Sequence, residues 1–164
     1  MAAKSFPRYG RIEGRYMGLG RPADPEHIGD TFLWMKRSER GPNTFSQTIQ
    51  NLEPGRLYSM KMYTCDYADL VNPKPRKIEE ATGFIGSVVL ENVEPDLKRS
   101  FSEIYASNPE PKIPVWITYH WKVFRARSRT AKLTVSDWPT EQQESRGFGQ
   151  EQTFNFLEIQ PYHE

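Results

Sequence analysis

Three aromatic residues stand beside polar side chains at predicted strand ends and in a predicted loop. Trp138 follows a strand and opens a polar loop, Tyr67 ends a strand, and Trp116 lies near the start of a long strand. An aromatic face packs against the C–H groups of a sugar ring, while surrounding polar groups bond the sugar's hydroxyls. These residue types therefore predict a ligand site with an aromatic platform.

Four polar residues near these aromatics are predicted to bond the ligand: Gln143, Arg146, Asp69 and His120. His120 shares the less apolar face of its strand with Trp116. A second interpretation remains open, in which Trp116 and Trp138 only cover the ends of the fold, because large aromatic residues are mostly buried. Trp34 and Trp121 lie in alternating strand patterns, and we expect both in the core.

Carboxylate pairs are the residues that a glycosidase would need. The candidates lie in charged loops, where solvated surface is the usual role. They are Asp66 with Asp69, Glu79 with Glu80, and Glu141 with Glu144. The histidines His27, His120 and His163 have no metal-ligand spacing. No nucleophile or phosphate-loop motif is present, so we expect no catalysis. A small enzyme with loop carboxylates is the weakest alternative.

Composition excludes several classes of protein. The 164 residues carry a formal net charge of +1, so no overall field attracts nucleic acid. Arg125, Arg127 and Arg129 form a small basic spot, which we interpret as a charged strand edge. The single cysteine, Cys65, is predicted to be a buried thiol. No apolar run is long enough to span a membrane, and residues 1–7 lack the apolar core of a signal peptide.

The predicted elements are almost all strands. Residues 1–30 are expected to form a loop with a short edge strand near residues 12–16. Residues 31–164 form the main domain, with strands over 31–37, 44–51, 57–67, 84–93, 114–126, 130–137 and 153–162. Pro54 and Gly55 predict a tight turn that pairs the strands at 44–51 and 57–67. Leu97, Phe101, Ile104 and Tyr105 predict a short helix over 96–107.

Three stretches resemble the galactose-binding-like superfamily of jelly-roll domains. The first runs from Gln47 through Leu52, Pro54 and Gly55 to Tyr58, the second covers 124–137, and the third covers 154–162. The resemblance implies an all-β antiparallel jelly-roll β-sandwich, here with one short helix. It also implies binding at loops on one end or on a concave sheet face.

Relatives of this type are accessory carbohydrate-binding modules of bacterial enzymes that degrade polysaccharides. The resemblance thus implies an oligosaccharide or polysaccharide ligand, an adjacent catalytic domain and an extracellular or periplasmic location within a longer protein. Many relatives hold a structural calcium, and Glu13 and Glu158 lie in the segments where they place its ligands. The alternative is a structural or protein-interaction accessory domain without a glycan site.

Overall fold

The computed structural model describes residues 3–5, 31–71, 77, 83–84, 86–106, 116–139 and 147–163. These residues form nine strands and one short helix, which confirms the all-β prediction. The strands are β1 (Ala3–Ser5), β2 (Thr31–Lys36), β3 (Thr44–Ile49), β4 (Leu57–Asp66), β5 (Ser87–Glu91), β6 (Val93–Ala106), β7 (Trp116–Ala126), β8 (Ala131–Ser136) and β9 (Glu151–Pro161). The helix is α2 (Tyr67–Val71).

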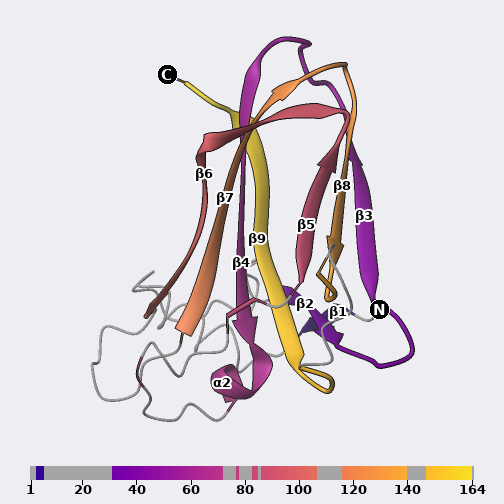
Figure 1. Cartoon of the computed structure of the whole chain (residues 1–164), viewed down its shortest axis with the longest axis vertical. Helices are drawn as coiled ribbons and strands as arrows, with labels where there is room; N and C mark the ends of the chain where they lie inside the picture. The colour runs from indigo at the N-terminus through magenta and orange to yellow at the C-terminus, as the bar shows by residue number, and fades with distance from the viewer. Residues whose placement is uncertain are drawn as a thin grey trace.

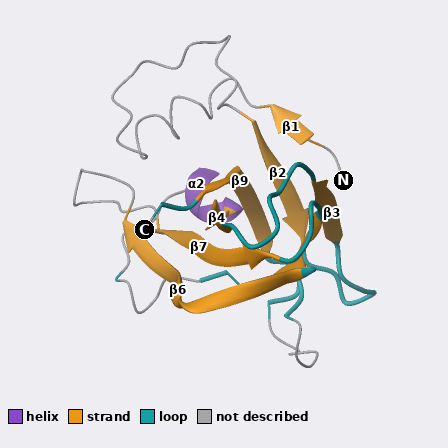
Figure 2. Ribbon diagram, turned by 90° about the horizontal axis from the view of Figure 1, so that it is seen from above, coloured by secondary structure: helices purple, strands orange, loops and turns teal. Residues whose placement is uncertain are grey.

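The strands form two antiparallel sheets of unequal width. The wider sheet has the order β1-β2-β9-β4-β7-β6, and the narrower sheet has the order β3-β8-β5. Figure 1 shows β3, β8 and β5 side by side, with β9, β4, β7 and β6 next to them. Seen from above, β6 and β7 lie at the opposite side of the molecule from β3 (Figure 2). The arrangement of the described strands is β-sandwich-like.

The main core lies between the two sheets. Met60 and Met62 of β4 and Leu133 and Val135 of β8 are fully buried, and Phe124 of β7 packs with them. Burial of such side chains stabilises each by roughly 1.5–3 kcal/mol relative to exposure. The alternation in β4 is the one that the sequence predicts, because Tyr58, Met60 and Met62 all join this core.

A smaller apolar cluster lies on the other face of the wider sheet, where β2, β4 and β7 meet. Phe32, Cys65 and Ile117 form its buried centre, and Trp34 and Tyr67 pack against it. The cluster explains why β2 is apolar on both faces, since Met35 belongs to the main core. The thiol of Cys65 is buried, as the sequence predicts.

The predicted pairing of the strands on either side of Pro54 and Gly55 is wrong. β3 pairs with β8, while β4 pairs with β7 and β9 in the other sheet. The connection holds Leu52 in the core at 4% exposure, and Gly55 N–H donates to the carbonyl of Ala126 at 2.8 Å. The turn therefore passes the chain from one sheet to the other.

The predicted helix over 96–107 is also wrong, because this segment belongs to β6. Asp96 pairs with Val123 and Phe101 pairs with Trp121, so the register shifts between these pairs. The extra residues form a bulge that carries Leu97 into solvent at 79% exposure. A bulge inserts extra residues and so interrupts the two-residue alternation of a strand. Here the interruption separates Leu97 from Phe101 by four residues, a spacing that is also typical of one face of a helix.

The described residues contain no helix long and apolar enough to cross a membrane. The edge strand predicted near residues 12–16 lies outside the described residues, as do the carboxylate pairs Glu79 with Glu80 and Glu141 with Glu144.

Candidate functional site

The structure gives Trp138 a structural contact. It lies two residues beyond β8 and is half-buried. Its indole Nε1–H donates to the carbonyl of Ser38 at 3.2 Å, and its backbone N–H donates to Ser136 Oγ at 3.1 Å. Next to it, the carboxylate of buried Asp137 accepts hydrogen bonds from the backbone N–H and side-chain amide of Asn43. Trp138 thus fastens the end of β8 to the turn after β2.

Tyr67 and Asp69 lie on the short helix α2 rather than at a strand end or in a loop. The ring of Tyr67 lies 6.3 Å from those of Phe32 and Trp34, centroid to centroid, and covers the smaller apolar cluster. Asp69 is only 4% exposed. Packing therefore accounts for the position of Tyr67, and Asp69 offers little surface to a ligand.

His120 is an interior residue at 3% exposure. Its Nε2 lies 2.9 Å from Thr64 Oγ1 and its Nδ1 lies 3.0 Å from Ser102 Oγ, while Phe84 packs edge-on at 5.0 Å. Burial, with a smaller effect from nearby Lys122, lowers the pKa of His120 to about 4. The imidazole is therefore neutral at pH 7 and links three strands.

Of the remaining residues predicted to bind the ligand, only Trp116 lies among those that the structure describes. Trp116 is half-buried at the start of β7, and its carbonyl lies 3.4 Å from Cys65 Sγ. The ends of β4 and β8 and the start of β7 lie at the same end of the molecule (Figure 1). Tyr67 directly follows β4, Trp138 follows β8 and Trp116 begins β7, so all three lie at this end. Gln143 and Arg146 lie outside the described residues.

Only one of the two predicted calcium ligands lies among the described residues. Glu158 lies on β9 and forms an ion pair with Lys61, while Glu13 lies outside the described residues. Among the residues that the structure describes, no group of three His, Cys, Asp or Glu residues could hold a metal ion.

A different aromatic cluster occupies the outer face of the wider sheet. We call it the aromatic face, and it consists of Tyr63, Tyr119, Trp121, Phe101 and Phe156. Phe101 is 41% exposed and the other four are half-buried. The rings come from four neighbouring strands, β9, β4, β7 and β6. A group of partly exposed aromatic rings in mutual contact thus spans four strands of the wider sheet.

Strand register builds this face in two rows that cross the sheet. Asn155, Tyr63, Tyr119 and Glu103 lie opposite one another in the first row. Glu158, Lys61, Trp121 and Phe101 form the second row. Neighbouring strands are ~4.8 Å apart, so each row places one side chain per strand at that spacing. The first row thus has two tyrosines between an amide and a carboxylate, and the second row places Trp121 and Phe101 beside the charged pair of Lys61 and Glu158.

The rings of the aromatic face pack against one another in defined orientations. Tyr63 and Tyr119 stack at 4.9 Å with planes 25° apart. Phe156 is turned 82° from Tyr63, and Phe101 is turned 69° from Tyr119. Burial, with nearby Tyr63, raises the pKa of Tyr119, so its phenol keeps its proton at neutral pH. The face therefore combines apolar ring surface with hydroxyl donors.

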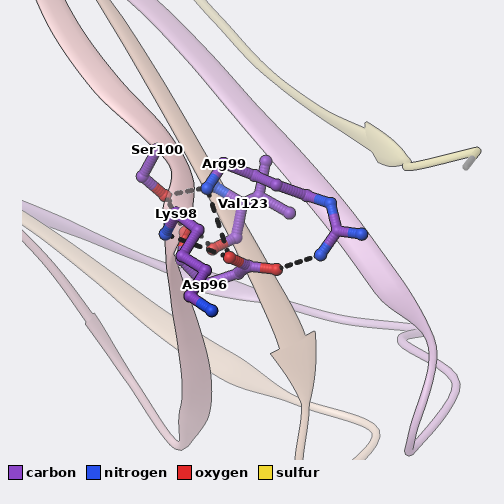
Figure 3. Close-up of polar contacts among 5 residues, drawn as sticks. All are labelled: Asp96, Lys98, Arg99, Ser100 and Val123. Atoms are coloured by element: carbon purple, nitrogen blue, oxygen red, sulfur yellow. Dashed lines mark hydrogen bonds and ion pairs between the residues drawn. The ribbon is translucent and has the colours of Figure 1, made fainter.

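Two bulges set the margins of the face. Phe156 has φ of 51° at the irregularity of β9, and this places an additional ring beside Tyr63. The bulge of β6 is held by Asp96, whose Oδ1 accepts from the N–H groups of Lys98 and Arg99 (Figure 3). Ser100 Oγ accepts from Val123 N–H at 2.9 Å. These bonds fix the point from which Phe101 resumes the strand.

Only part of the aromatic face can be predicted from the sequence. Alternation places Tyr119 and Trp121 on one side of β7, but it predicts that this side faces the core, and that prediction is wrong. The structure instead turns the side with Thr118, His120 and Phe124 toward the narrower sheet. The ladder of β7 with β4 and β6 then brings Tyr63 and Phe101 beside them, and sequence spacing does not reveal that ladder.

Comparisons with protein-family models, with curated proteins and with solved structures found no match to this chain.

Proposed function

We propose that this chain is a non-catalytic carbohydrate-binding module with a jelly-roll fold of the galactose-binding-like type. The observation that carries the proposal is the aromatic face, whose rings cross four strands and have polar side chains at both margins. Sugar rings pack their C–H groups on aromatic surface, and their hydroxyls need nearby donors and acceptors. Lys61, Glu158 and Glu103 supply these groups in the two rows.

This proposal moves the ligand from the loops at one end of the fold to the outer face of the wider sheet. Among the candidates, Asp69 and His120 are buried and Tyr67 covers the smaller apolar cluster, whereas Phe101 is 41% exposed and the other four rings of the aromatic face are half-buried. The module would serve an adjacent polysaccharide-degrading domain by holding the polymer near it.

The test is calorimetric titration and affinity electrophoresis with a panel of neutral and acidic polysaccharides. We expect Trp121→Ala and Phe101→Ala to weaken binding at least tenfold, because loss of one ring contact of about 1.4 kcal/mol corresponds to a factor of ten. Trp138→Ala is the matched control, since this tryptophan is also half-buried but lies away from the face. Far-UV and near-UV circular dichroism of each variant establishes that it is folded.

Two results would contradict the proposal. Loss of binding in Trp138→Ala with normal binding in Trp121→Ala would return the site to the loop end. Absence of binding to every polysaccharide would favour an accessory domain that contacts protein. Exposed Leu97, the residue directly after the first run of β6 pairs and four residues before Phe101, is the observation that favours this second function.

A further inference from the structure

The two sheets differ in width, and the difference leaves one side of the sandwich open. The narrower sheet ends at β3, which pairs only with β8 among the described residues. The wider sheet continues past this position through β9 to β2 and β1. The inner face of β9 is therefore not fully covered where the narrower sheet ends.

A groove of about 490 Å³ occupies this position. Its floor is apolar and formed by Leu133, Leu157 and Ile159, and its wall is the segment from Gln47 to Gln50. A second hollow of about 260 Å³, lined by Phe45 and Phe154, shares Leu157 with it. Leu157 and Ile159 pack against the main core yet remain only half-buried. The groove is thus an uncovered extension of the core.

Backbone groups line both sides of this groove. In an antiparallel strand every second residue directs its N–H and C=O to each side, so half of those in β3 point away from β8. β2 pairs with β9 only at residues 151–154 of β9. From residue 155 onward, β9 pairs only with β4 among the described residues, so its other edge has no paired strand there. The groove therefore offers strand-like hydrogen-bonding groups as well as an apolar floor.

The edge at β3 lacks the protection that natural edge strands carry. Residues 44–52 contain no charged residue and no proline, although 43 of the 164 residues are charged, 22 basic and 21 acidic. Exposed edges are normally blocked by charges, prolines or bulges, because they otherwise pair with other strands. The other sheet has such a device at its edge, the bulge of β6.

We propose that β3 receives a fourth strand, contributed by an extended, uncharged peptide segment of a partner protein with apolar side chains at alternate positions. The peptide backbone would pair with β3, and its inward side chains would fill the groove over Leu157 and Ile159. This is recognition by strand addition. The wall from Gln47 to Gln50 carries no charge, so it suits an uncharged peptide. The groove lies between the sheets, whereas the aromatic face lies on the outer side of the wider sheet.

A single extended segment fits this place better than a second copy of the chain. β2 and β1 extend the wider sheet on the same side as the groove. A second copy that paired through its own β3 would bring its six-stranded sheet against them. An isolated strand carries no such sheet.

The test uses the full chain and a synthetic nine-residue peptide, capped at both ends, in which valine alternates with threonine between terminal serines. Binding is followed by calorimetry and by hydrogen exchange. We expect saturable binding, with exchange of the amides over 44–50 slowed at least tenfold. Gln47→Lys, which places a charge in the groove, should weaken binding at least tenfold. Ser46→Lys is the control, because this adjacent exposed residue lies on the opposite face of β3.

Several outcomes would overturn the proposal. These are absence of binding up to millimolar peptide, protection confined to another strand, and equal loss in both lysine variants. Slow exchange at β3 in the free chain would show that the edge is already occupied. Dimerisation on sedimentation that Gln47→Lys abolishes would identify a second copy as the occupant. Glycan binding is measured on the same variants and should be unchanged, which separates this test from that of the proposed function.

Discussion

At the scale of single residues, His120 shows how burial changes the role of a side chain. The ring is enclosed between β4 and β6, and both nitrogens have hydroxyl partners in Thr64 and Ser102. Burial of a hydrogen-bonded polar group lowers the free energy of unfolding only slightly, whereas burial of a charge lowers it much more. The site tolerates the neutral ring and opposes its protonation.

The lowered pKa of His120 predicts that the protein loses stability in mild acid. The pKa is about 4 in the folded chain against an ordinary value of 6.5, so the unfolded chain binds the proton first as the pH falls. The contribution of neutral His120 to the free energy of unfolding is therefore constant above pH 6.5 and is lost as the pH falls from 6.5 to 4. The loss amounts to about 3 kcal/mol at pH 4, from ~1.4 kcal/mol per unit of pKa difference.

Urea unfolding of the protein and of His120→Gln at pH 7.5, 6, 5 and 4 checks this prediction. The wild-type free energy of unfolding should fall more steeply below pH 6.5 than that of the variant. The exposed, non-titrating residue Gln160 supplies the control, since Gln160→Ala should keep the wild-type slope. Parallel slopes for wild type and His120→Gln would contradict a lowered pKa.

At the scale of elements, the connection between β3 and β4 decides how the sandwich closes. Leu52 N–H donates to the carbonyl of Arg129, and Gly55 N–H donates to that of Ala126, so the connection is attached to the neighbouring β7–β8 turn. Gly55 has φ of 86°. An added Cβ at this position would meet nothing within 4 Å, so only the backbone conformation requires glycine.

Gly55→Ala is expected to lower the free energy of unfolding by about 1 kcal/mol, the cost of a left-handed conformation for a residue with a Cβ. Thermal and urea unfolding measure the loss. Glu53→Ala is the control in the same turn. It removes only an exposed ion pair with Arg56 and should change stability by less than ~0.5 kcal/mol. A Gly55→Ala variant as stable as the control would show that the turn can relax.

The bulge of β6 gives the wider sheet a defined edge. Asp96 accepts two backbone hydrogen bonds and pairs with Arg99 at 2.6 Å (Figure 3). The side-chain hydrogen bond from Arg99 is the main cause of the lowered pKa of Asp96. The bulge interrupts the edge against further pairing and restarts the strand at Phe101. Edge protection and the aromatic face thus depend on the same local structure.

At the scale of the whole molecule, one core joins the two sheets. Leu133 of β8 is fully buried and belongs to the same cluster as Met60 and Met62 of β4. Because Leu133 packs against side chains of both sheets, its burial stabilises both of them. We therefore expect the two sheets to unfold together.

Leu133→Ala should therefore destabilise the chain by about 3 kcal/mol, within the range for leucine truncation in a core, without separating the transitions. Circular dichroism reports the sheets and tryptophan fluorescence reports the side chains. The two probes should give one midpoint. Lys132→Ala, the exposed neighbour of Leu133, should change stability by less than ~0.5 kcal/mol. Two separate midpoints would mean that the sheets unfold independently.

The sequence by itself determined the class of the fold and the positions of most strands. Alternation in β4, β7 and β8 is a local pattern, and Pro54 and Gly55 mark a turn whatever the rest of the chain does. Prediction failed where a local pattern had two explanations. The spacing of Leu97, Phe101 and Ile104 suits a helix, and only pairing with β7 shows that a bulged strand produces it.

The tertiary structure alone decided which strands pair and which side of each strand faces inward. β7 carries large side chains on both sides, so alternation defines two faces but does not say which one the second sheet covers. Packing with Met60, Met62 and Phe154 places Phe124 inside. His120 is buried on the same side of β7 against Phe84, and Trp121 is left on the outer face. The aromatic face spans residues 63 to 156, and it exists only because non-local hydrogen bonding brings four strands into register.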